Sequence, residues 1–264
     1  MSRALATVGE KLPKGWGDLG RQIGILIGVD IIYELGRGIA DPSKPEAIAH
    51  GQQVIDFERG IHSLFEPDLQ NFFLNAHWTV DLANQLYLNA QFSIALGFLV
   101  WLYLFRNENY YFVRNMFVVS MCLALIGYIG FPTAPPRMFP GDGFVDTVVK
   151  YSSVNHDSTI AKVFINPYAA VPSMHCAFAL MIGGSGLAVC RNRWAKAWWA
   201  FWPILVAWVV MVTANHYWVD WILGWMVAVA AFAIAKGALA RWKPEAWDWH
   251  TSTRRRAGPR EVEA

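Results

Sequence analysis

The chain alternates between long apolar stretches and short segments that carry most of its charge. The apolar stretches cover residues 23–39, 80–105, 112–131, 172–190, 198–214 and 216–239. A helix of roughly 20 apolar residues crosses the hydrocarbon core of a bilayer, where only helices and closed barrels satisfy all of their backbone hydrogen bonds. We therefore expect an all-α polytopic membrane protein, a six-transmembrane-helix bundle.

The composition agrees with a membrane protein. Of the 264 residues, 55% are hydrophobic and only 16% are charged, whereas soluble domains carry about 25% charged residues. A soluble protein with a large core is the alternative. The small net charge of +2 gives no support for a nucleic-acid partner. Cys122, Cys176 and Cys190 have no metal-type spacing and are expected to be free thiols.

A single membrane domain is expected to span residues 23–240, between a cytoplasmic N-terminal segment, residues 1–22, and a basic, aromatic cytoplasmic tail, residues 241–264. Between the first two spans, apolar residues recur at helical spacing within residues 52–65, which predicts a surface amphipathic helix. Residues 132–171 are rich in Gly, Pro, Asp and Asn. We expect them to form a long extracytoplasmic loop that covers a site.

The distribution of Lys and Arg predicts the orientation. With six spans, sixteen Lys and Arg residues fall on the side of both termini and six fall on the other side. Positively charged loops remain cytoplasmic. Both termini are therefore expected in the cytoplasm, and the long loop on the extracytoplasmic side.

Two of the expected spans carry polar side chains. In the first span, Asp30, Glu34 and Arg37 share a helix face that is expected to look into the bundle. The second span has a polar face of its own, made by His77, Asp81, Asn84 and Gln91. These groups either bond neighbouring helices or recognise a substrate. We carry His77, Asp81 and Asn84 forward as candidate substrate-binding residues.

Two pairs of reactive side chains stand at helix starts on the extracytoplasmic side. Ser173 and His175 begin the fourth span, where free backbone N–H groups and the helix dipole favour an anion. His216 and Asp220 begin the sixth span and lie one helical turn apart. The carboxylate of Asp220 can orient one ring nitrogen of His216 while the other nitrogen faces a reactant.

This arrangement predicts phosphoryl chemistry without a cofactor. An oriented imidazole attacks phosphorus, and a second imidazole protonates the departing alkoxide. We assign the attack to His216, its orientation to Asp220 and the general acid to His175. Arg137, the only Arg that the predicted topology places nearby, offers a guanidinium fork for phosphate oxygens, together with Ser173.

Other interpretations of these residues remain open. Either histidine alone can be a hydrogen-bonded core residue, and Arg137 can be a loop anchor. His175, His216 and Asp220 also have the side-chain types of a metal site. In a non-catalytic transporter or lipid-binding membrane protein, the same polar residues would line a pathway. Vanadate-dependent oxidation is a further alternative.

Three strings carry a resemblance to a known family. They are "FPTAPPRM" around Arg137, "NPYAAVPSMH" ending at His175 and "ANHYWVDWILG" from Ala214. The chain resembles the type 2 phosphatidic acid phosphatase superfamily, in the branch that contains inositol phosphorylceramide synthase and bacterial membrane phosphatases. The resemblance implies a six-helix bundle in a bacterial plasma membrane, an outward-facing site, metal-independent chemistry, a phosphohistidine at His216 and a lipid phosphate substrate.

The chain also departs from the pattern of that superfamily. Gly130 stands where the first motif has a Lys, Val209 and Val210 stand where the third has Ser-Arg, and Met174 replaces a Gly. Two phosphate-binding cations are therefore missing, so either Arg137 does more of the binding or a further residue helps it, with Lys150, Lys162, His77 and Asn215 as the candidates. The departures resemble the transferases that move a phospho-headgroup between lipids, so the acceptor of the phospho group is water or an alcohol such as a polyol.

Overall fold

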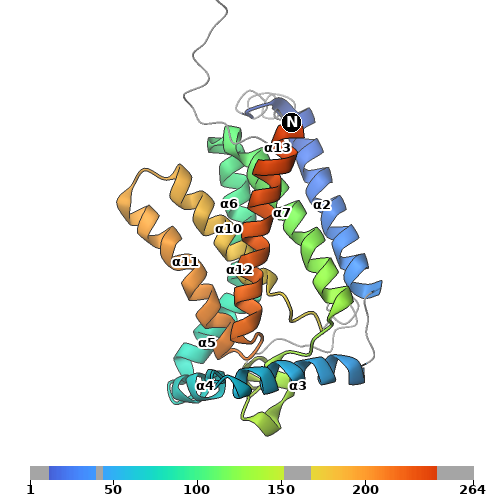
Figure 1. The fold of residues 1–264 in the computed structure, drawn as a ribbon. Helices are drawn as coiled ribbons and strands as arrows, with labels where there is room; N and C mark the ends of the chain where they lie inside the picture. Colours follow the sequence, from blue (N-terminus) through green and yellow to red (C-terminus); the bar gives the residue numbers. More distant parts are fainter. Residues whose placement is uncertain (1–11, 40–43, 152–167, 243–264) are drawn as a thin grey trace, which may run out of the picture.

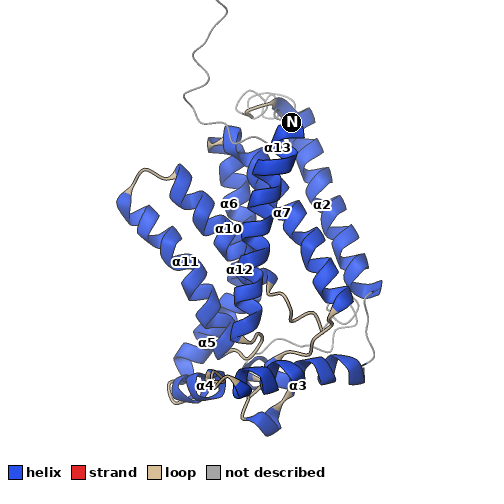
Figure 2. Ribbon diagram, viewed as in Figure 1, coloured by secondary structure: helices blue, strands red, loops and turns tan. Residues whose placement is uncertain are grey.

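A computed structural model of the chain describes residues 12–39, 44–151 and 168–242 (Figure 1). The expected basic tail beyond residue 242, much of the N-terminal segment and part of the long loop lie outside these residues. Within them the protein is helical and contains no strand, and only an isolated β-bridge joins Thr133 to Ala169 (Figure 2). The predicted all-α class is confirmed.

Long helical segments run along the long axis of the protein, and further helices lie across one end (Figure 1). The long segments are α2 (Gly15–Ile39), α6 (Gln91–Phe105), α7 (Asn107–Gly130), α10 (Met174–Val189), α11 (Arg193–Val212) and α12 (Trp218–Ala233). The crossing helices are α3 (Lys44–Gly60) and α4 (Glu66–Leu74). The π-helical segment η4 (Ile234–Leu239) and α13 (Ala240–Trp242) continue α12.

In the part of the chain that the structure describes, three helical segments are long and apolar enough to cross a membrane: Asn107–Gly130, Arg193–Val212 and Trp218–Trp242. A fourth is obtained if the bent pair His77–Asn89 and Ser93–Phe105 counts as one span, and Met174–Val189 is a shorter apolar helix. The predicted second span is therefore not one straight helix. It is divided into α5 (His77–Gln85), the π-helical turn η1 (Leu86–Ala90) and α6.

Small residues set the closest helix contacts. A Cβ added at Gly186 of α10 would lie 2.4 Å from Cγ of Trp199 in α11, and one at Gly224 of α12 would lie 2.2 Å from the carbonyl oxygen of Ser173. Close backbone approach through Gly is the usual way in which helices pack in membranes. The contact at Gly186 holds α10 against α11, and the contact at Gly224 holds α12 directly against the start of α10.

The predicted surface helix is α3, which begins earlier than the sequence pattern indicates. It is fastened to the loop after α7: the N–H of Ala134 donates to the carbonyl of Ala47 at 2.9 Å, and Nδ1 of His50 lies 2.7 Å from the carbonyl oxygen of Pro132. The loop itself contains the 3-10 turns η2 (Pro136–Met138) and η3 (Pro140–Asp142) and the short helix α8 (Thr147–Tyr151). It is therefore ordered where the structure describes it.

Candidate active site

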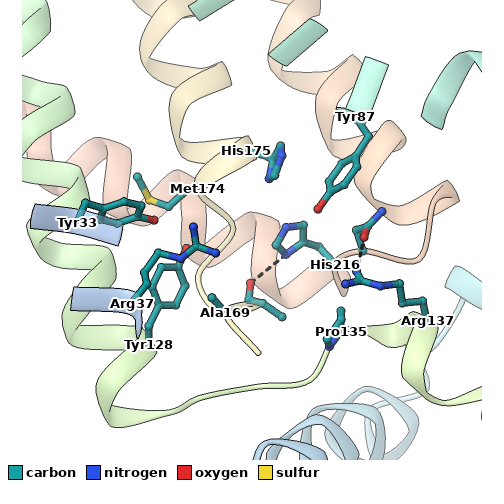
Figure 3. A pocket seen from close by; sticks show the side chains of 12 residues that line it. Tyr33, Arg37, Tyr87, Tyr128, Pro135, Arg137, Ala169, Met174, His175 and His216 are labelled. Atoms are coloured by element: carbon teal, nitrogen blue, oxygen red, sulfur yellow. Dashed lines mark hydrogen bonds between the residues drawn. The ribbon is translucent and has the colours of Figure 1, made fainter. Parts of the chain in front are cut away.

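His175 and His216 face one cavity of about 150 Å³, near the ends of α2 and α7 and the starts of α10 and α12 (Figure 3). Its polar lining consists of these two histidines, two arginines, three tyrosines and one amide. The lining residues are Tyr33, Arg37, Tyr87, Tyr128, Pro135, Arg137, Ala169, Ala170, Met174, His175, Asn215 and His216. Ligand pockets for drug-sized molecules usually measure roughly 300–1,000 Å³, so this cavity suits a small polar group.

His216 is fixed by two acceptors on the same ring nitrogen. Its Nδ1 lies 2.9 Å from the carbonyl oxygen of Ala170 and 3.3 Å from Oδ2 of Asp220. Oδ2 of Asp220 also accepts the N–H of Tyr217 at 3.0 Å. The predicted pairing of His216 with Asp220 is thus present, but the nearer acceptor is a main-chain carbonyl, which has no side-chain signature in the sequence.

These two acceptors define the tautomer of His216. Since both groups accept hydrogen bonds, the proton of the neutral ring resides on Nδ1, and Nε2 keeps its lone pair. The neutral ring with its lone pair on Nε2 is the form of the imidazole that can act as a nucleophile.

His175 stands across the cavity from His216. The two ring centroids are 5.7 Å apart with an interplanar angle of 57°. His175 is stacked on Tyr87 from η1, with centroids 4.5 Å apart and an angle of 22°. The second span thus contributes an aromatic support for His175, where the sequence analysis expected polar recognition groups.

Ser173 lies beside the cavity and does not line it. Its Oγ accepts the N–H of Cys176 at 3.4 Å and caps α10, and its own N–H donates to the carbonyl of Asp220 at 3.0 Å. The helix start uses the hydroxyl as its N-cap, and the direct phosphate contact of Ser173 stays a prediction.

Arg137 and Asn215 are brought together as one polar unit. Nη1 of Arg137 donates a short hydrogen bond to Oδ1 of Asn215, and its backbone N–H donates to the carbonyl of Ala214 at 2.8 Å. Asp146 lies 3.7 Å from Nε of Arg137. Asn215 and Asp146 therefore orient the guanidinium group of Arg137. Both Arg137 and Asn215 line the cavity.

A second arginine, Arg37 of α2, also lines the cavity. Figure 3 shows Arg37 and Arg137 on opposite sides of His216. The expectation that Arg137 is the only Arg near the histidines is therefore wrong. The predicted polar face of the first span already contained Arg37. A polar helix face alone does not indicate which neighbouring helices it packs against, so it did not place Arg37 beside the two histidines.

The candidate polar residues of the second span do not line this cavity. His77 and Asp81 are exposed on α5. Asn84 is buried, donates to the carbonyl of Thr147 at 3.0 Å and accepts from Oγ1 of Thr147 at 3.0 Å. The interpretation that holds for Asn84 is the structural one, since its amide fastens α5 to α8.

Two buried carboxyl groups, missed by the sequence analysis, support the start of α12. Oε1 of Glu66 accepts the N–H of Trp218 at 2.8 Å, and Oε1 of Glu58 accepts the N–H of Val219 at 3.4 Å. Both side chains are fully buried. Burial raises the pKa of both, that of Glu58 to about 10. Contact with Glu66 raises the pKa of Glu58 further, whereas the hydrogen bond with Glu58 lowers the pKa of Glu66. The two carboxyl groups orient the start of α12, which directly follows His216.

The described residues contain no group of three or more His, Cys, Asp and Glu side chains that could hold a metal ion. His175, His216 and Asp220 are near one another, but Oδ2 of Asp220 accepts the N–H of Tyr217 and lies against the side of His216 that bears its proton. The arrangement differs from a converging ligand set for a metal ion.

Comparison with protein families gives one match. A family model described as the PAP2 superfamily matches residues 52–234, which include Arg137, His175, His216 and Asp220. Comparisons with curated proteins and with solved structures give no match. Members of this superfamily are generally phosphatases, and several long apolar helices fit an integral membrane protein. The match covers more than half of the sequence, and the chain belongs to the PAP2 superfamily.

Proposed function

We propose that the protein is a membrane-embedded enzyme that cleaves a lipid phosphate ester through a phosphohistidine at His216. The observation that carries the proposal is the orientation of His216: two acceptors hold its Nδ1–H, so that Nε2 is the basic nitrogen, and His175 stands 5.7 Å away between ring centroids. One nitrogen is thereby made nucleophilic, and a second imidazole is available for proton transfer.

In the first half-reaction, Nε2 of His216 attacks phosphorus and forms a P–N bond. The P–O bond to the alcohol breaks, and His175, which takes up a proton as the anionic substrate binds, gives that proton to the departing oxygen. In the second half-reaction, neutral His175 accepts a proton from water or from an alcohol, whose oxygen attacks phosphorus. The P–N bond breaks, and the electron pair returns to His216.

Charge stabilisation comes from one side of the cavity. Arg137, held by Asn215 and Asp146, presents its fork to the phosphoryl oxygens, and Asn215 adds an amide to the same unit. The start of α10 adds the positive end of a helix dipole. Preorganised donors of this kind supply most of the rate in phosphoryl transfer.

We place the cavity at the extracytoplasmic face of a single six-span domain covering residues 23–240, with both termini in the cytoplasm. The excess of Lys and Arg on the opposite side supports this orientation. The six spans of this arrangement are the three helices that are long and apolar enough to cross a membrane, the bent pair, α2 and the shorter apolar helix α10; α2 and the bent pair carry the polar groups. In this arrangement α3 and α4 lie at the outer membrane surface.

Transfer to an acceptor alcohol, as in the inositol phosphorylceramide synthase branch, is the form of the reaction that we favour over plain hydrolysis. The cavity of about 150 Å³ holds a phosphoryl group with a small alcohol beside it, while the lipid chains would remain in the bilayer. Met174 lines the cavity where the sequence pattern of the superfamily has Gly.

His216→Ala tests the proposal. We expect the purified full-length variant to lose at least ~10³-fold of the rate of lipid phosphate cleavage, because the nucleophile is gone, and to form no acid-labile phosphoprotein in a rapid quench with radiolabelled lipid phosphates. Exposed His77→Ala is the matched control and should keep full activity. Unchanged cleavage by His216→Ala would refute the proposal. If added alcohols do not reduce the release of free phosphate by the wild type, the reaction is hydrolysis and not transfer.

A further inference from the structure

The side of the cavity opposite Arg137 holds a second cation on a helix that the family match does not include. Arg37 lies in the last turn of α2, before the matched residues 52–234 begin, and it lines the same cavity as His175, His216 and Arg137. Its side chain is 19% exposed. A buried guanidinium directed into a cavity requires a defined environment, because an unpaired buried charge is costly.

The surroundings of Arg37 keep its charge and fix its position. Nη1 donates to Oε1 of Glu34 at 2.7 Å, one helical turn earlier. The guanidinium carbon lies 5.6 Å from the ring centroid of Tyr33 and 6.0 Å from that of Tyr128. Both rings are within the range of cation–π attraction. The ion pair and the two rings therefore hold the guanidinium where it reaches the cavity (Figure 3).

Tyr128 connects the surroundings of Arg37 to the start of α10, the helix that contains His175. Its hydroxyl donates to the carbonyl oxygen of Pro172 at 3.1 Å, three residues before His175. On α2, a Cβ added at Gly36 would meet Cδ2 of Leu125 at 3.0 Å, so α2 and α7 are in close contact beside Arg37. The contact of α2 with α7 and the hydrogen bond from Tyr128 to Pro172 thus define the position of Arg37 relative to the start of α10.

The charges of the cavity lining specify the ligand. Among the described residues, two arginines and no carboxylate line it; Glu34 and Asp146, which pair with the arginines, are outside the lining. With both histidines neutral, the lining of the free cavity carries two positive charges, and these match a phosphoryl group that bears one or two negative charges. Arg37 and Arg137 lie on opposite sides of His216 (Figure 3).

We propose that Arg37 is a second phosphate-binding residue, which together with Arg137 clamps the phosphoryl group of the substrate over His216. The inference rests on the proposed function and extends it: α2 becomes part of the site, and the ligand is an anionic phosphoryl group held by two guanidinium forks. Each fork provides paired N–H donors to the equatorial oxygens, whose charge grows during transfer.

Binding of orthovanadate, a phosphate analogue, to the full-length protein in detergent tests the proposal, with titration calorimetry as the measurement. We expect Arg37→Ala to weaken vanadate binding roughly 10- to 100-fold, the loss that one charge-assisted hydrogen-bonding group produces. Arg37→Lys keeps the charge but loses the fork, and should fall between the wild type and Arg37→Ala. The corresponding fall in kcat/KM for lipid phosphate cleavage should be at least as large.

Arg114→Ala is the matched control. Arg114 of α7 also bridges to α2, where it donates to Oε1 of Gln22, but it does not line the cavity. It should weaken vanadate binding less than twofold. Added guanidinium ion should restore part of the activity of Arg37→Ala, which a purely structural defect would not allow.

The outcomes separate this inference from the proposed function. If Arg37→Ala binds vanadate as the wild type does, or if the wild type does not bind vanadate, the second-cation role is wrong. If Arg37→Ala and Arg114→Ala lose binding equally, with equal losses in thermal midpoint, Arg37 is structural. Cleavage that disappears in His216→Ala but persists in Arg37→Ala would leave the phosphohistidine intact and remove only the clamp.

Discussion

The cavity has two sides that are built by different means. The histidine side, His175, His216 and Asp220, is formed by the starts of α10 and α12 and is held by main-chain contacts: Nδ1 of His216 against the carbonyl of Ala170, and the N–H of Ser173 on the carbonyl of Asp220. The α2 side, Arg37 with Tyr33 and Tyr128, is held by an ion pair and aromatic rings.

The difference predicts different tolerance to change. Backbone contacts leave little freedom, since a shift of one helix start moves the carbonyl partners of the other, and packed interiors do not deform continuously. Side-chain contacts such as those of Arg37 can be altered singly. We infer that the chemical step depends on the histidine side, while the α2 side sets how strongly an anion is bound.

The largest effect is expected from Asp220→Asn. An amide keeps the size of the side chain but removes the charge that stabilises the developing imidazolium of the phosphorylated His216. Because the carbonyl of Ala170 still accepts Nδ1–H at 2.9 Å, we expect kcat to fall about 10²–10³-fold, with little change in KM. Steady-state kinetics with a lipid phosphate measures this. A loss below tenfold would show that the carbonyl alone orients the ring.

Gly224→Ala tests the rigidity of the histidine side. Its Cβ would lie 2.2 Å from the carbonyl oxygen of Ser173 and 3.3 Å from the backbone nitrogen of Ala177, so α12 would have to move away from α10. We expect a loss of about 1–3 kcal/mol in stability and a fall in kcat.

Gly184→Ala is the control for that substitution, because Gly184 is a helical glycine of α10 with open space around its Cβ. It should stabilise the protein slightly. The thermal midpoint and activity in detergent are the measurements. A Gly224→Ala protein with wild-type activity would mean that the two helix starts can separate without affecting the site.

The histidine side is also the part that the sequence predicted best. Short local spacing placed His216 and Asp220 on one helix turn, and the superfamily strings identified His175 and Arg137. What the sequence did not reveal are the contacts made by main-chain atoms, such as the carbonyl of Ala170, because any residue at that position supplies the same carbonyl group. The N-cap role of Ser173 was missed for a related reason, since one hydroxyl serves either a helix or a ligand.

The α2 side shows the limit of periodicity. The spacing of Glu34 and Arg37 indicated an inward-facing polar stripe, but only the packing of α2 on α7 brings Arg37 to the cavity. Similarly, the polar face of the second span suggested recognition, while the π-helical turn at η1 rotates the chain so that Tyr87 faces His175. The orientation of a helix and the position of a break in it depend on long-range contacts, which cannot be recognised in a single sequence.

The smallest effect on activity concerns the carboxyl pair that supports α12 from the crossing helices, because neither carboxyl group lines the cavity. Glu58, whose pKa is raised from its ordinary value of 4.5 to about 10, keeps its proton in the folded protein and loses it when the chain unfolds at neutral pH. A raised pKa gives stability that is complete below about pH 4.5 and is lost as the pH rises toward 10. Glu66 shifts in the same direction, and Tyr217 and Asp220 are its acidic neighbours.

Glu58→Gln should therefore flatten this dependence. Its amide oxygen can still accept the N–H of Val219, as Oε1 of Glu58 does at 3.4 Å, and it cannot ionise. Between about pH 5 and about pH 9 the wild type should lose stability with a slope of at most ~1.4 kcal/mol per pH unit from this group, and the variant should lose less.

Thermal midpoints in detergent across this pH range measure the difference, with Glu46→Gln, an exposed position on the same helix, as the control. If the variant and the wild type lose stability in parallel, Glu58 is ionised in the folded protein. In that case the start of α12 would be held by a carboxylate, and Glu58 would add no pH dependence to the stability between about pH 5 and about pH 9.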